Sequence, residues 1–97
     1  MALLKVDLAR AVLHLADTAK ATPVPIGPDF WHSVPPILAT GRMVACIPHA
    51  TSWDSWEMHP RGDEVVIVLS GRVRLLCHGC GAIEAGAGEA VLIPAGV

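Results

Sequence analysis

The second part of the chain consists of short apolar segments separated by turns, and this pattern strongly limits the possible folds. From Gly41 onward, Gly, Pro, Ser and Asp recur between these segments, and no stretch is long enough for a helix between strands. Strands this closely spaced favour an antiparallel sandwich or barrel. The predicted strands cover residues 42–47, 53–59, 64–69, 72–77, 82–84 and 89–93.

The first 40 residues have a different character. Residues 7–20 predict a short helix with Asp7 as its N-cap, because apolar residues recur at spacings of three and four. Residues 22–36 contain five prolines and predict an extended arm that is not a packed element. We therefore expect an N-terminal helix and proline-rich arm over residues 1–40, followed by a β-barrel over residues 41–97.

Composition indicates a globular protein and excludes two classes of partner. The chain has 97 residues, enough for one domain, and 53% of them are hydrophobic, which favours a homodimer that covers part of the apolar surface. The net charge is −2 and Lys and Arg occur singly, so no basic stripe suits nucleic acid. No apolar run approaches the ~20 residues that span a bilayer.

The N-terminal residues and the cysteines favour a cytoplasmic protein. Charged residues, including Lys5 and Asp7, interrupt the apolar N-terminus, which is not typical of a signal peptide. Three cysteines suit a reducing compartment better than a disulfide framework. Cys77 and Cys80 form a Cys-x-x-Cys pair, but they fall on a predicted hairpin turn without a second pair, so we expect neither a redox pair nor a zinc site there.

Three residues around one turn indicate a candidate metal site. Glu57 and His59 are two apart on a predicted strand and therefore point to one face, and Glu64 opens the next strand. Two carboxylates and an imidazole on an inward face are costly to bury without a partner. A divalent cation is a suitable partner, and this donor set fits manganese, iron, nickel or zinc.

The spacing of these residues resembles the cupin family. His59, four residues, Glu64, six residues and Gly71 resemble the second half of the first cupin motif, and Gly88, five residues, Pro94, one residue and Gly96 resemble the start of the second. The resemblance covers roughly residues 41–97. It implies an all-β jelly-roll barrel that is incomplete at the C-terminus, because the family's last histidine ligand would fall three residues after Gly96.

The resemblance also implies which residues form the site. His59 and Glu64 match metal ligands of the family directly, whereas Glu57 stands where the family has a histidine and Thr51 where it has a glycine. Glu57 either substitutes as an oxygen ligand or marks a lineage without metal, and both interpretations stay open. Trp53 and His49 are candidate pocket residues.

Two classes of function remain open. The first is a metal-dependent enzyme, such as an oxygenase or isomerase, that acts on a small polar molecule in the barrel cavity. The second is a metal-free module that binds a small molecule or serves as a structural dimerisation domain. Stoichiometric metal in the purified protein distinguishes the two classes.

Overall fold

The computed structural model describes residues 2–52 and 55–97, and the chain divides into two compact units, Met1–Ser52 and Trp53–Val97. All regular structure in the described residues is β-strand, apart from one short 3-10 helix, Pro36–Ala39. The prediction of an all-β chain is therefore confirmed. Among the described residues, no helix is long and apolar enough to cross a membrane.

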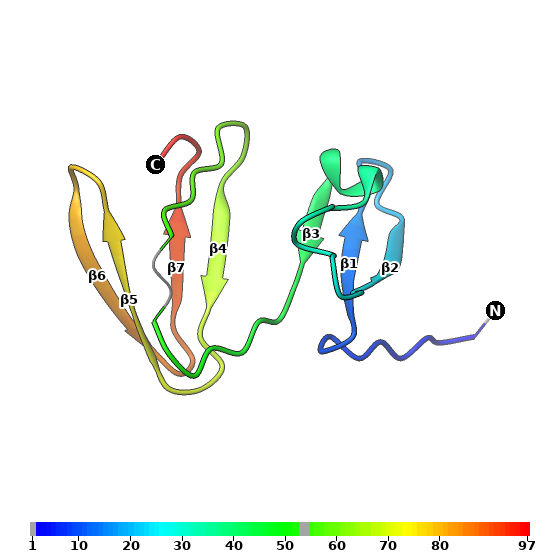
Figure 1. Cartoon of the computed structure of the whole chain (residues 1–97), viewed down its shortest axis with the longest axis horizontal. Helices are drawn as coiled ribbons and strands as arrows, with labels where there is room; N and C mark the ends of the chain where they lie inside the picture. Colours follow the sequence, from blue (N-terminus) through cyan, green and yellow to red (C-terminus); the bar gives the residue numbers. More distant parts are fainter. Residues whose placement is uncertain (1, 53–54) are drawn as a thin grey trace. The chain divides into compact units, whose positions relative to one another are not determined.

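The first unit is built on a three-stranded antiparallel sheet. Strand β1 (Ala11–Leu15) lies in the middle, between β2 (Ala21–Pro25) and β3 (Arg42–Val44) (Figure 1). Residues 13–15 of β1 are paired with both neighbouring strands.

The predicted helix over residues 7–20 is wrong, because its central residues form β1. Burial alternates along this strand, with Val12 and His14 buried and their neighbours half-buried, which is the period of two that a sheet imposes. Pairing on both edges outweighed the weak helical periodicity. Asp7 still caps a local structure, a turn in which its carboxylate accepts a hydrogen bond from the Ala9 amide at 2.9 Å.

The proline-rich arm is also more structured than predicted, since its first residues form β2. Pro23 and Pro25 are exposed on this strand, whereas Val24 between them is buried. Strand β2 lies at the edge of the sheet. An edge strand tolerates proline because only one side of its backbone has to be paired.

The core of the first unit is small and includes a structural histidine. Val12, Val24 and Phe30 form its buried apolar cluster. The imidazole of His14 is also buried, and its Nε2 lies 2.6 Å from the carbonyl oxygen of Thr40. This hydrogen bond satisfies a buried polar side chain that would otherwise be costly to exclude from water.

The second unit contains two antiparallel strand pairs. Strand β4 (Glu64–Ile67) pairs with β7 (Ala90–Ile93), and β5 (Arg72–Cys77) pairs with β6 (Gly81–Gly86) (Figure 1). The two strand pairs share one apolar cluster. One buried residue of this cluster comes from β6, one from β7 and one from the turn after β4. These residues are Val68, Ala85 and Val91.

The second unit confirms most of the strands predicted for it, with one clear exception. Residues 55–59, which belong to the predicted strand 53–59, form no strand, and residues 53 and 54 lie outside the described residues. The described sheets do not close into a continuous barrel.

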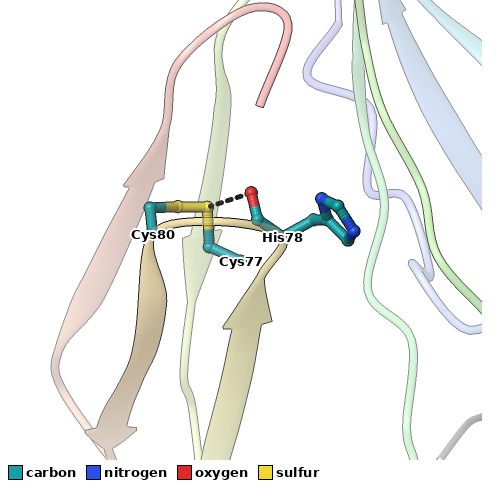
Figure 2. The surroundings of a disulfide bond; sticks show 3 residues. All are labelled: Cys77, His78 and Cys80. Atoms are coloured by element: carbon teal, nitrogen blue, oxygen red, sulfur yellow. Dashed lines mark hydrogen bonds between the residues drawn. A yellow bond between two sulfur atoms is a disulfide. The ribbon is translucent and has the colours of Figure 1, made fainter.

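The turn between β5 and β6 holds a feature that the sequence analysis did not predict. Cys77 and Cys80 are joined by a disulfide bond (Figure 2). Cys46 is a free cysteine and is exposed.

Candidate functional site

The candidate site lies where the two half-motifs of the sequence meet. Strands β4 and β7 pair so that Glu64 is opposite Ile93. The pairing continues past the strand ends, where the Val68 amide donates to the Glu89 carbonyl at 3.0 Å and the Gly88 amide donates to the Val68 carbonyl at 2.8 Å. Two sequence segments more than 20 residues apart therefore form one ladder.

Two hydrogen bonds hold the loop before β4 against the residues after β7. The Gly96 amide donates to the carbonyl oxygen of His59 at 2.9 Å. The Ala95 amide donates to Oδ1 of Asp63, also at 2.9 Å. The loop is thus positioned by the second half-motif, although residues 55–59 form no strand.

Asp63 is a site-positioning residue that the sequence analysis missed. An aspartate directly before a strand is a recognisable signal, because its short carboxylate readily accepts a hydrogen bond from a nearby backbone amide. The amide that donates to Asp63, however, belongs to Ala95, which is distant in the sequence, so the local pattern does not identify it.

His59 and Glu64 lie close together, as the sequence predicts. Nε2 of His59 is 3.6 Å from Oε1 of Glu64, and the two side chains are 56% and 38% exposed. They attract each other as ions only when the imidazole is protonated. An ion pair this exposed contributes about 0–1 kcal/mol to stability, so the fold does not depend on it and both side chains remain accessible to a ligand.

The other predicted site residues are Glu57, His49 and Trp53. Glu57 is exposed and lies in the irregular segment before His59. His49 is exposed and belongs to the first unit. Trp53 falls outside the described residues. Their roles as metal ligand and pocket residues stay predictions.

The described donor set is smaller than a typical catalytic metal site. Within residues 2–52 and 55–97, no group of three or more His, Cys, Asp or Glu side chains could hold a metal ion. Catalytic metal sites in proteins commonly have three protein ligands. His59 and Glu64 supply two suitable donors, so the arrangement shown does not by itself make a complete metal centre.

Comparison with known proteins agrees with the motifs. Comparisons with curated proteins and with solved structures gave no match. The family model described as a cupin domain matches residues 43–97, which is more than half of the chain and includes His59, Glu64 and both half-motifs. The chain therefore belongs to the cupin family.

Proposed function

We propose that this protein is a small-molecule-binding cupin in which His59 and Glu64 form the polar recognition group. One observation carries the proposal: an imidazole and a carboxylate lie 3.6 Å apart, both partly exposed. Their loop is fixed by hydrogen bonds to residues 95 and 96. A polar pair that adds little to stability yet is held in place is suited to recognition.

The pair defines the chemistry of the ligand. The carboxylate of Glu64 accepts hydrogen bonds, whereas the imidazole of His59 donates or accepts according to its protonation state. A small polar molecule that carries both a hydrogen-bond donor and an acceptor, such as a hydroxy acid, matches these groups. Hydrogen bonds that involve a charged partner contribute about 1.5–3 kcal/mol each.

A second candidate function is a metal-dependent enzyme, such as an oxygenase or isomerase. The observation that favours it is the chemistry of the adjacent pair, because imidazole and carboxylate together suit manganese, iron, nickel or zinc. Glu57 does not form a three-residue metal group with this pair in the described structure, so in this candidate the irregular segment before His59 has to bring Glu57 onto the metal as the third ligand.

One set of variants tests both candidates. We expect His59→Ala to weaken binding of a panel of hydroxy acids about tenfold, measured by saturation-transfer NMR, because a charge-assisted hydrogen bond is lost. His32→Ala is the matched control, since His32 is also exposed and lies in the other unit. Equal affinity in both variants would contradict the proposal.

Metal analysis of the same samples separates the two candidates. About one metal ion per chain in the wild type and in His32→Ala, but not in His59→Ala or Glu57→Ala, would favour the enzyme. Loss of ligand binding without any change in metal content would favour the metal-free binding module.

We also propose that the outer face of the β4–β7 sheet is a homodimer contact. Val65 and Leu92 are paired across the sheet and exposed, and Ile67 on the same face is exposed as well. Exposed apolar side chains grouped in this way favour association with a second copy through identical faces. We expect Leu92→Glu to shift the protein to monomer in analytical ultracentrifugation, whereas Leu3→Glu, at an exposed residue of the other unit, leaves the mass unchanged.

A further inference from the structure

The Cys77–Cys80 disulfide lies in a turn whose backbone is ordered independently of the sulfur atoms. The Cys80 amide donates to the Cys77 carbonyl at 3.2 Å, which closes a four-residue turn. Gly79 adopts φ 81°, a left-handed conformation that suits glycine at the third position of a type II turn. The two Cα atoms are 5.1 Å apart, within the usual range for a disulfide. The turn therefore keeps both cysteines adjacent in the reduced state as well.

The two cysteine residues differ in their exposure to solvent. Cys80 is exposed, whereas Cys77 is half-buried. Figure 2 shows the imidazole of His78 directed away from the disulfide, so the ring does not cover the sulfur of Cys80. Sγ of Cys77 lies 3.9 Å from the carbonyl oxygen of His78, which can accept a weak hydrogen bond from this thiol once it is reduced. An external thiol can therefore reach Cys80 more easily than Cys77.

The disulfide adds little to the stability of the hairpin. It spans only a sequence separation of three, and the loop-closure effect of a cross-link is smallest for short loops. The hairpin is already held by continuous pairing from Arg72 opposite Gly86 to Cys77 opposite Gly81. A bond that is exposed on one side and weakly coupled to folding is free to open and close.

We propose that Cys77 and Cys80 form a site of reversible thiol–disulfide exchange with an external dithiol. A thiolate of the dithiol attacks Sγ of Cys80, the Cys77–Cys80 bond breaks, and Cys77 leaves as a thiolate that takes up a proton. The second thiol of the partner then attacks the mixed disulfide and releases Cys80. The protein gains two electrons and two protons, and the dithiol loses the same number as it becomes a disulfide.

The site is distinct from the His59–Glu64 pair, and its test does not depend on ligand binding there. The protein is equilibrated without oxygen in glutathione buffers of stepped reduced-to-oxidised ratio, quenched in acid and alkylated, and its mass is measured. All samples carry the Cys46→Ser substitution, because the exposed free Cys46 would otherwise react with glutathione and with the alkylating reagent. We expect Cys77 and Cys80 to become alkylated together, reversibly, within the range of ratios that glutathione provides.

Single variants test the predicted direction of attack. In Cys77→Ser the exposed Cys80 should form a mixed disulfide with oxidised glutathione about tenfold faster than Cys77 does in Cys80→Ser, because access limits this reaction. A pair that stays oxidised at every glutathione ratio, even when a trace of dithiothreitol is added as the dithiol, is a structural disulfide and overturns the proposal. Equal rates in the two single variants, or two thiols that never close in oxidising buffer, overturn it as well.

Discussion

The two units of this protein use a histidine in opposite ways. In the first unit, the side chain of His14 is only 4% exposed, and its ring is hydrogen-bonded to the carbonyl oxygen of Thr40. In the second unit, the side chain of His59 is 56% exposed and lies beside a carboxylate that is itself partly exposed. The same residue type therefore completes a core in one unit and is accessible to ligands in the other.

The difference shows how burial and partner together separate a structural from a functional histidine. In a buried imidazole, the nitrogen that is hydrogen-bonded to the backbone cannot also bind a ligand. Removing the imidazole leaves the backbone carbonyl without its hydrogen bond. An exposed ring beside a carboxylate keeps its capacity for recognition and contributes little to folding. Substitution of each residue should therefore change a different property.

The largest expected effect concerns the core that surrounds His14. Phe30→Ala should lower the free energy of unfolding by about 3–5 kcal/mol, because it empties the centre of a small apolar cluster. The neighbouring exposed ring provides a matched control: Trp31→Ala should cost much less, since half of that side chain is already in water. Urea unfolding followed by circular dichroism measures both.

A milder variant and a local probe keep this prediction testable if Phe30→Ala does not fold. Phe30→Leu retains most of the apolar volume and should cost about 1 kcal/mol. Hydrogen exchange of this variant should show lost protection in β1 and β2 and unchanged protection in β4 and β7, because the two units have separate buried clusters. Equal loss in all four strands would break the comparison between the units.

The smaller effect is the direct contrast of the two histidines. His14→Ala should cost about 2 kcal/mol, because it leaves a cavity and an unpaired Thr40 carbonyl. His59→Ala should change stability by less than about 0.5 kcal/mol, as is usual for exposed side chains. Thermal unfolding of the two variants under one buffer measures the difference, and a larger cost for His59→Ala would show that His59 has a structural role.

Close approach around His14 explains part of its structural role. A side chain added at Gly41 would meet both the Leu15 carbonyl and the ring of His14, and Gly41 itself adopts φ 72°. Glycine is therefore required beside this histidine for two reasons, conformation and space. Beside His59, Gly96 also adopts a left-handed φ of 83°, but a side chain added there would meet no atom within 4 Å, so only the constraint on conformation is shared.

The sequence predicted the second unit well because its signals are local. Strand β5 was predicted with its observed bounds, Arg72–Cys77, and β4 and β7 were predicted within two residues at their ends. Alternation of apolar residues and turn residues is enough to define such strands. His59 and Glu64 were also predicted to lie around one turn, and they are adjacent although residues 55–59 form no strand.

The first unit was predicted poorly because its structure depends on partners far along the chain. Residues 11–15 have both a weak helical and a weak alternating pattern, and pairing with β2 and β3 selected the strand. Pro23 and Pro25 argued against a packed element, but an edge position removes that objection.

By itself, the sequence determined the family, the β-strands of the second unit and the two residues of the candidate pair, because motif spacing and alternation are properties of neighbouring residues. Only the tertiary structure decided that β4 pairs with β7, that Asp63 and the His59 carbonyl accept hydrogen bonds from residues 95 and 96, and that Cys77 and Cys80 are bonded. These contacts satisfy polar groups or join sulfur atoms across the folded chain. Their partners are fixed by packing in space, which local pattern does not encode.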